Sequence, residues 1–470
     1  MNQSSDLQEI HILNLPDEIF LHIFSYVNVA SCKNVFEVCR RFYELMSVVR
    51  RGCPLELTYS QSVKVINPDE NISKLNLYKL KKLTIMNGSN CLNILNRIPK
   101  DTLKEAIISF RDVDKGLQQF FNQQTNIKML KIDEKNQVNF DHLKLEHLEI
   151  NKEFFNSKFM NIPSILRVQP RLRYIDFTDY LIEDEIFKAI CELRNLEVAK
   201  MRVNLEMPCH VFESLKNLTQ LKELQIKSDK IHQCNHLLEL SRMHLKIEKL
   251  TLLYKEEKFL PEFCIQLSHN FRNLKQIRIV NRSFFIINTI LENFPNLESI
   301  VLDCYHWSTE ENVLVVRENL RHEKLKEIVV TSVYDDSAVT TRSLLTLLNA
   351  CPNLERIMLS QLVEVYYEDL QQIINDHPKL THLSLHFNIF DFEDGIIDLI
   401  RTAASRLQFI ELEGLFSSAD FQTESSLKDL FEDEFTYISY SDYGYDDFIY
   451  DGTLTMKKRN VSKWYRDLNM

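Results

Sequence analysis

Apolar residues recur along this chain, from residue 80 onward, in one short phrase: apolar, two variable, apolar, one variable, apolar. The starts of the phrase lie 18 to 29 residues apart, about 25 on average. Because side chains alternate between the two faces of a strand, each phrase predicts a strand with buried fourth and sixth residues and displayed third, fifth and seventh residues. The fourteen phrases begin at Leu80, Leu103, Ile127, Leu145, Leu172, Leu196, Leu221, Ile247, Leu274, Leu297, Leu325, Leu354, Leu380 and Leu407.

The residues between successive phrases are numerous enough for a loop and a helix. Segments 343–352 and 369–378 have helical apolar spacing, and each ends with a proline two residues before the next leucine. Pro170 and Pro295 stand at the same place in their own repeats, where proline stops a helix. The repeat at Ile127 is followed after only 18 residues, so we expect it to lack a helix.

This period and phrase resemble the leucine-rich repeat. The resemblance implies an α/β solenoid with a curved parallel sheet inside and helices outside. The curvature has a physical reason, because strands stack at about 4.8 Å whereas packed helices need about 8 to 10 Å. We expect the solenoid, of about 14 irregular repeats, over residues 53–416, and a C-terminal cap with an acidic-aromatic tail over 417–470.

Residues 13–46 lie before the repeats and have a helical pattern of their own. Pro16 begins a first helix with acidic residues in its first turn, and Ile19, Ile23 and Phe24 form an apolar stripe. A second helix follows the break at Asn28. A few short helices bury too little apolar surface to be stable alone. They therefore either pack on a neighbour or present apolar residues to a partner.

The sequence LPDEIFLHIFSYV, with VCRRFYEL about twenty residues later, resembles an F-box, and we expect this all-helical domain over residues 8–50. The resemblance implies binding to the Skp adaptor of a cullin–RING ubiquitin ligase. An F-box before leucine-rich repeats resembles the noncatalytic substrate receptors of such ligases. The alternative is a leucine-rich-repeat scaffold or inhibitor without a ubiquitin role, in which residues 13–46 merely cap the solenoid. The residues that match the adaptor-binding motif are Leu15, Pro16, Ile19, Ile23, Phe24, Val35, Val38, Cys39 and Phe42.

Composition argues against most enzyme classes. The chain has only 7 glycines and contains no GxGxxG, GxxxxGK[ST] or GxSxG motif, so we expect no cofactor and no catalytic residue. The net charge is −11, but eight acids fall within Asp429–Asp451, which leaves about −3 on the rest and gives no case for nucleic acid or a membrane as partner. Scattered cysteines, no long apolar run and an acidic start without Lys or Arg predict a cytoplasmic or nuclear location.

The displayed strand positions are the best binding candidates. Exposed apolar surface rimmed by charge usually marks an interaction site, and we expect a target protein there unless long loops or the tail cover the row. The tail is either a disordered acidic-aromatic peptide or a final cap that folds back on the concave face. Basic residues at the displayed positions include Lys227, and an apolar row beside them includes Leu253. The predicted target-binding residues are Lys200, Arg202, Arg278, Val280, Val301, Val329 and Met358.

Two groups of residues could suggest a metal site. His232, Cys234, His236 and His244 lie close together in sequence, but they belong to the loop and helix of one repeat and lack the second ligand pair that zinc sites use. The pair at 335–336, two aspartates, is more typical of a solvated loop. We therefore expect no metal.

Overall fold

The computed structural model describes most of the repeat region. By spatial contact the chain divides into two compact units. Unit 1 is Met1–His147 with Lys152–Met160, and unit 2 is Leu148–Asn151 with Asn161–Met470. The described residues are 55–60, 80–86, 95–109, 115–133, 138–151, 161–204, 206–228, 235–254, 261–281, 286–304, 315–332, 340–390, 395–416, 437–442 and 450–457.

Unit 1 holds four parallel strands that pair in chain order. These are β1 (Leu55–Ser60), β2 (Leu80–Met86), β3 (Glu105–Ser109) and β4 (Met129–Asp133), with helix α6 (Lys115–Asn122) between β3 and β4. The phrase did not predict β1, because Pro54 stands where the phrase has its first apolar residue. Residues 138–146, after β4, contain turns and no helix, as the short interval predicts.

Unit 2 contains a parallel sheet in which β6 to β15 pair in chain order. The strands are β5 (His147–Asn151, in this unit from Leu148), β6 (Tyr174–Ile182), β7 (Val198–Val203), β8 (Glu223–Ser228), β9 (Lys249–Tyr254), β10 (Gln276–Asn281), β11 (Ser299–Cys304), β12 (Glu327–Ser332), β13 (Arg356–Val365), β14 (His382–Phe390) and β15 (Phe409–Phe416). Strands β2 to β15 correspond to the fourteen phrases, so the expected leucine-rich-repeat fold is confirmed.

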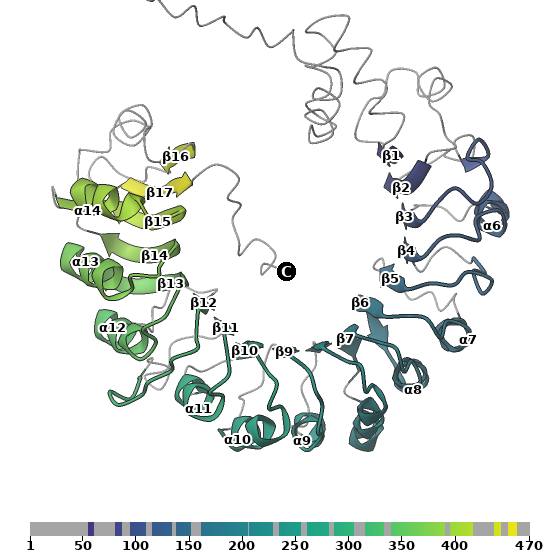
Figure 1. Ribbon diagram of the computed structural model, residues 1–470, viewed down its shortest axis with the longest axis horizontal. Helices are drawn as coiled ribbons and strands as arrows, with labels where there is room; N and C mark the ends of the chain where they lie inside the picture. Colours follow the sequence, from purple (N-terminus) through teal and green to yellow (C-terminus); the bar gives the residue numbers. More distant parts are fainter. Residues whose placement is uncertain are drawn as a thin grey trace, which may run out of the picture. The chain divides into compact units, whose positions relative to one another are not determined.

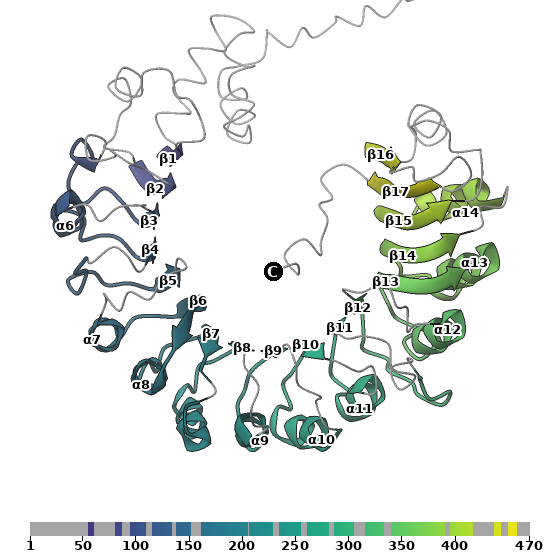
Figure 2. The same cartoon turned by 180° about the vertical axis from the view of Figure 1, so that it is seen from behind.

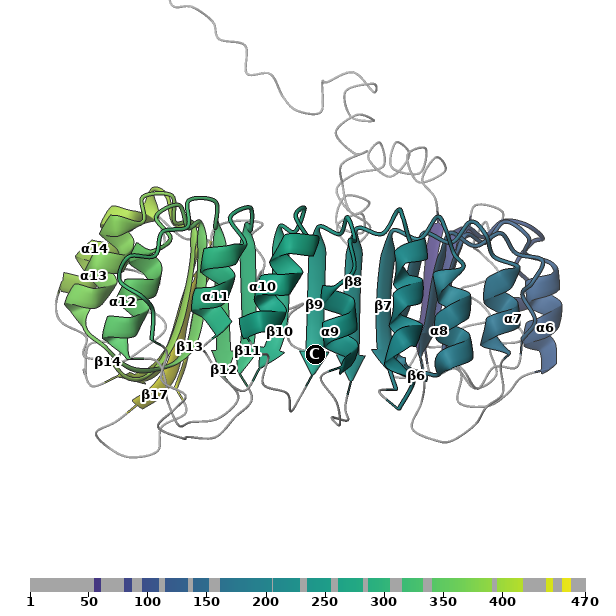
Figure 3. The same ribbon diagram turned by 90° about the horizontal axis from the view of Figure 1, so that it is seen from below.

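Helices cover one face of the unit 2 sheet and leave the other face to the strands (Figures 1 and 3). They are α7 (Ile162–Arg167), α8 (Asp184–Cys191), the 3-10 helix η3 (Cys209–Asn217), α9 (Asn235–Ser241), α10 (Pro261–Asn270), α11 (Ile286–Asn293), α12 (Thr341–Asn349), α13 (Tyr367–Asp376) and α14 (Gly395–Ala404). Some of their starts are capped by side chains: the Thr340 hydroxyl accepts a hydrogen bond from the Ser343 N–H at the start of α12.

The core lies between the sheet and the helices. The fourth and sixth residues of the phrases are buried there, as Ala199 and Met201 are on β7. Large side chains from the helices fill the remaining space, and the rings of Phe187 on α8 and Phe212 on η3 stack with centroids 5.0 Å apart. The alternation along each strand therefore separates a packed side from a displayed side.

The described part of the C-terminal tail folds as an antiparallel hairpin. Strand β17 (Tyr450–Lys457) pairs with β15, and β16 (Tyr437–Asp442) pairs with β17, so the hairpin continues the sheet beyond the last repeat (Figure 2). The sequence left a disordered peptide and a folded cap as alternatives. In the described residues the tail does neither: it extends the sheet beside β15, and its backbone groups are paired along the sheet.

A repeated backbone contact joins successive repeats of unit 2 at the edge where the chain enters each strand. The N–H of the second phrase residue donates to the carbonyl of the second residue one repeat earlier, as from Lys222 to Glu197 (2.8 Å) and from Glu248 to Lys222 (2.7 Å). The pattern continues without a break to Gln408, which donates to Thr381 (2.8 Å). One obligatory hydrogen bond per repeat therefore fixes the relative height of neighbouring strands.

The side chains at this second position alternate in charge. The series is Arg173, Glu197, Lys222, Glu248, Lys275, Glu298, Lys326 and Glu355. Ion pairs link neighbours, including Lys222 with Glu197 (2.7 Å) and Lys275 with Glu248 (2.9 Å). Hydrogen bonds from Lys222 and Arg173 hold the pKa of Glu197 below its usual value. We name this series the edge ladder.

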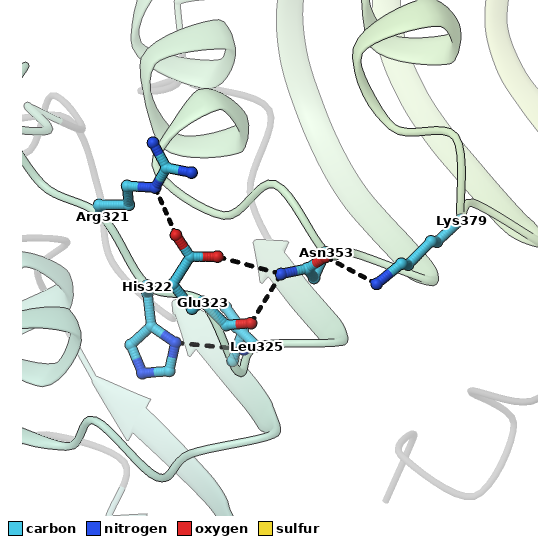
Figure 4. Close-up of polar contacts among 6 residues, drawn as sticks. All are labelled: Arg321, His322, Glu323, Leu325, Asn353 and Lys379. Carbon is cyan, nitrogen blue, oxygen red and sulfur yellow. Dashed lines mark hydrogen bonds and ion pairs between the residues drawn. The ribbon is translucent and has the colours of Figure 1, made fainter.

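Buried polar side chains complete the hydrogen bonding between repeats, and His322 is the best-defined case (Figure 4). Its Nε2 lies 2.8 Å from the carbonyl oxygen of Phe294, one repeat earlier, and its Nδ1 accepts from the N–H of Leu325 (3.1 Å). A neutral imidazole with its proton on Nε2 satisfies both contacts. His236 makes the corresponding contact with the carbonyl of Met207 (2.7 Å).

In several repeats an asparagine stands directly before the first leucine of the phrase, and its side chain forms a hydrogen bond to the previous repeat at the surface. Asn353 donates from Nδ2 to the carbonyl of Glu323 (2.8 Å) and accepts from Lys379 Nζ (2.8 Å), so it links three repeats (Figure 4). Asn195 donates to the carbonyl of Pro170 in the same way (2.9 Å). Each of these contacts joins the asparagine of one repeat to a backbone carbonyl in the turn before the previous strand.

We expect His322→Ala to destabilise the protein by about 3 kcal/mol, because it leaves two buried backbone groups without partners. Urea unfolding measures this free-energy change. His244→Ala, at an exposed histidine, is the matched control and should change the free energy of unfolding by less than about 0.5 kcal/mol. Equal stability of the two variants would contradict the role assigned to His322.

Candidate functional site

The adaptor-binding residues predicted from the sequence lie outside the described residues. This applies to all nine positions from Leu15 to Phe42. Their role stays a prediction. The domain boundaries at 8–50, 53–416 and 417–470 likewise stay predictions.

The second predicted site lies on the sheet face of unit 2 opposite the helices, which we call the concave face (Figure 1). The register places Arg278 beside Val301, Val301 beside Val329, and Val329 beside Met358. These fifth-position residues form one continuous row across four strands, as the repeat predicts. Val280 is the seventh residue counted from the start of its phrase at Leu274, and it lies on β10.

The expectation that the apolar row is exposed is wrong. Val280 and Met358 are each 4% exposed, Val301 is 6% exposed and Val329 is 0% exposed. Val301, Val329 and Met358 form one buried hydrophobic cluster with Phe409, the third residue of the last phrase. The row therefore belongs to a second, smaller core on the concave face.

The flanking polar residues explain part of this burial. On one side of the row, Arg278 Nε lies 2.8 Å from Asp303 Oδ2, and the Thr331 hydroxyl donates to Asp303 Oδ1 (2.6 Å). On the other side, Glu327 accepts from the Ser299 hydroxyl and pairs with Arg356 (3.1 Å). Rows two residues apart along a strand lie about 6.6 Å from each other, so these linked side chains lie close on both sides of the valines.

The last two repeats carry a buried polar group. The Ser384 hydroxyl donates to Glu411 Oε2 (2.9 Å), and His386 Nε2 lies 3.6 Å from the same oxygen. Ser384 is 0% exposed and Glu411 is 1% exposed. The serine proton points to the carboxylate, so the histidine does not activate this hydroxyl as a nucleophile. The arrangement satisfies a buried charge and does not resemble a hydrolytic site.

His382 lies beside this group and stacks on the Phe409 ring, with centroids 6.2 Å apart. Burial, and secondarily the Arg356 charge, lower its pKa to about 4. The imidazole is therefore neutral at neutral pH, which suits its contact with an aromatic ring.

The opposite end of the unit 2 concave face is more open and more polar. Lys200 lies over the Tyr174 ring, 5.5 Å from its centroid, and its Nζ is 3.9 Å from Asp176 Oδ2. Burial, and then the Asp176 carboxylate, raise the pKa of Tyr174. Arg202 and Lys227 follow at the seventh position of β7 and β8, and both are half-buried. This region presents charged groups that a binding partner can reach.

Of the histidine and cysteine candidates, His236 has a structural role, and His244 is exposed. His236 is buried and its ring contacts Phe212 edge-on, 5.2 Å between centroids, while His232, Cys234 and the aspartates at 335–336 lie outside the described residues. Within the described part of the chain, no three His, Cys, Asp or Glu side chains are grouped so as to hold a metal ion.

The described cysteines are free thiols. Burial raises the pKa of Cys264 and of Cys351 to about 12, so both are protonated and unreactive at neutral pH. In the same described segments, no helix combines the length and apolar character needed to span a bilayer.

Sequence reasoning missed the acidic residues of the concave face. Asp303 and Glu411 were not among the predicted site residues, although both occupy displayed positions. The sequence contained a signal for Asp303. It lies two residues after Val301, on the same face of β11, and Val301 lies beside Arg278. The register places Asp303 diagonally across from Arg278, within reach of a long side chain.

Comparison with known proteins adds one assignment and two likenesses. Residues 12–49 match the F-box-like family model. No curated protein matches the chain. An internalin from Listeria monocytogenes is 15% identical, with a TM-score of 0.33, over 66% of this chain and 76% of the internalin. A leucine-rich-repeat protein of Leptospira interrogans is 14% identical, with a TM-score of 0.34, over 76% of this chain and 98% of that protein. At these values, neither likeness bears on function.

We expect Val329→Asp to destabilise the protein by about 4 kcal/mol, because the new carboxylate would be buried in the small core of the concave face. Chemical unfolding measures the change. Gln276→Asp adds the same charge at an exposed position of this face and serves as the control. If both variants unfold at the same denaturant concentration, the row is open rather than packed.

We also expect the burial of His382 to make the free energy of unfolding depend on pH. The folded-state pKa of His382, about 4, lies below the ordinary histidine pKa of about 6.5. The unfolded chain therefore binds this proton first, and stability is lost as pH falls from about 6.5 to about 4. His382→Gln should lose less stability than the wild type over this range in urea unfolding at several pH values. His269→Gln, at an exposed histidine, should follow the wild type; identical curves for all three proteins would refute the assignment.

Proposed function

We propose that this chain, an F-box-like segment followed by a leucine-rich-repeat array, is the target-binding subunit of a Skp–cullin–F-box ubiquitin ligase. The single observation that supports this most is the F-box-like match at residues 12–49, directly before the array. In this role the segment docks the Skp adaptor, and through it the cullin and RING subunits. The array holds a target protein for ubiquitination and proteasomal degradation.

The mechanism is proximity, because a bound target lysine near a loaded transferase is at a high effective concentration. The chain itself is a noncatalytic adaptor in this proposal. It works in the cytoplasm, the nucleus or both, where such ligases meet their targets. Neither a nucleic acid nor a membrane is needed as a partner.

Target contact in this proposal falls on the charged part of the concave face. Lys200, with 22% of its side chain exposed, and Arg202 keep accessible surface, whereas the cluster of Val301, Val329 and Met358 is closed. Arg278 and Val280 lie at the border between the two regions. In this proposal the buried apolar row stabilises the concave face, and the accessible polar residues of the same face contact the target.

We expect Ile23→Asp with Phe24→Asp to abolish co-purification with the Skp adaptor. The two charges would lie on the apolar stripe that must lose its water on docking, which costs several kcal/mol. Co-expression of tagged full-length chain with the adaptor, followed by affinity purification, measures the result.

The matched control is Ser25→Asp with Asn28→Asp, which adds the same two charges at polar positions of the same segment. It should retain the adaptor. If the wild type fails to co-purify with the adaptor, or if both double variants retain it, residues 13–46 only cap the array. The protein would then be a binding scaffold or inhibitor without a ubiquitin role.

A further inference from the structure

The outer strand of the C-terminal hairpin lies at the edge of the unit 2 sheet. β16 pairs with β17 on one side, and among the described strands it has no neighbour on its other side (Figure 2). Its six residues include no Lys, Arg or Pro, and its register with β17 continues without a shift. Natural edge strands are usually protected by lysine, proline or a bulge. In the described part of the chain, β16 therefore presents an unprotected row of backbone N–H and carbonyl groups.

The sequence on both sides of this strand is acidic. Eight acids and no Lys or Arg fall within Asp429–Asp451. Three of the acids come shortly before β16, namely Glu432, Asp433 and Glu434. Four more fall at the end of β16, in its connection to β17 and at the start of β17, namely Asp442, Asp446, Asp447 and Asp451.

The two ends of β16 differ in the charges that balance these acids. At the first end, Tyr437 lies opposite Lys457 of β17, and two further cations follow Lys457 in sequence. At the second end, Asp442 lies opposite Gly452, which follows Asp451. The hairpin sequence contains no cation at this second end, so its negative charge is left for a binding partner to balance.

A second copy of this chain fits the edge poorly. If two β16 strands paired antiparallel about a two-fold axis, residues just before β16 in one copy would lie beside residues just after β16 in the other. Both of these stretches are acidic, with Glu432–Glu434 before the strand and the aspartates at 446–447 after it. Like charges that face each other across strands oppose pairing. The charges around β16 thus disfavour self-association and favour an occupant with cations.

We propose that the edge of β16 binds an extended segment of a partner protein by strand addition, with Lys or Arg residues of that segment at the end beside Asp442. Strand addition supplies main-chain hydrogen bonds, and side chains supply the specificity. An antiparallel addition continues the alternation of β15, β17 and β16 and is slightly more stable per residue than a parallel one. It places the N-terminal end of the segment beside Asp442. The occupant is therefore about six residues, or about 20 Å, of extended chain that begins with basic residues. This role adds a second contact to the proposed function and does not depend on it.

Two fluorescently labelled peptides of equal composition test the direction of binding. One has two lysines followed by six alternating threonine and valine residues, and the other has the reverse sequence. Fluorescence anisotropy with the full-length chain should show at least about tenfold tighter binding of the lysine-first peptide. Hydrogen exchange should show that the amides of β16 exchange more slowly in the complex. Equal affinity for the two peptides, or unchanged exchange in β16, would overturn the proposal.

Charge variants test the end of the strand. Asp442→Lys with Asp451→Lys should weaken binding of the lysine-first peptide at least about tenfold, because it places repelling charges beside the lysines of the peptide. Asp179→Lys with Asp376→Lys makes the same charge change at exposed residues of β6 and α13 and should bind the peptide as the wild type does. Equal weakening by both double variants would show attraction by net charge only and refute strand addition at this edge.

The other possible occupants give different results. The basic residues after β17 are neutralised within the full-length chain by the combined changes Lys458→Gln, Arg459→Gln, Lys463→Gln and Arg466→Gln. A gain in peptide affinity of about tenfold or more in this variant would show that the C-terminal residues of the chain itself occupy the edge, and would overturn the choice of a partner. A wild-type chain that sediments as a dimer and does not bind the peptide would do the same in favour of a second copy. A wild-type chain that retains the Skp adaptor but not the peptide refutes this inference alone.

Discussion

The hydrogen bond between the second residues of successive phrases is the contact on which the rest of unit 2 depends. It recurs from repeat to repeat, as between Lys222 and Glu197 and between Gln408 and Thr381. Because it sets the height of each strand against its neighbour, equivalent positions align into rows even though the repeats differ in length. The variation in length is absorbed by the helices and loops on the other face, where no such alignment is required.

The sequence predicted the strands because their signal is local. Each phrase encodes its own strand, and the register then follows from stacking identical phrases. The sequence did not predict β1, because Pro54 interrupts the phrase. It did not predict the β16–β17 hairpin, because these strands pair antiparallel and lie outside the repeat. Exposure on the concave face was mispredicted for a different reason. Val329 is buried in a cluster with Val301, Met358 and Phe409 of other repeats, and no single phrase contains these contacts.

Within unit 2 the two ends of the concave face differ in how they treat charge. Toward β15, carboxylates are buried and bonded, as Glu411 is to Ser384, and the apolar row is packed. Toward β7, lysine and arginine side chains keep contact with solvent. Burial fixes side chains in one arrangement, whereas half-buried lysine and arginine side chains keep their charged ends in water. The two ends therefore differ in kind: one is a packed, bonded surface, and the other keeps charged groups in contact with solvent.

The alternation of sign along the edge ladder restricts how the array can change length. Arg173, Glu197, Lys222 and Glu248 follow one another with opposite charges, and their ion pairs join adjacent repeats. Excision of a single repeat would bring two residues of the same charge together, whereas excision of two consecutive repeats would preserve every attraction. The edge ladder therefore favours gain or loss of repeats two at a time, because only such changes keep opposite charges next to each other along this edge.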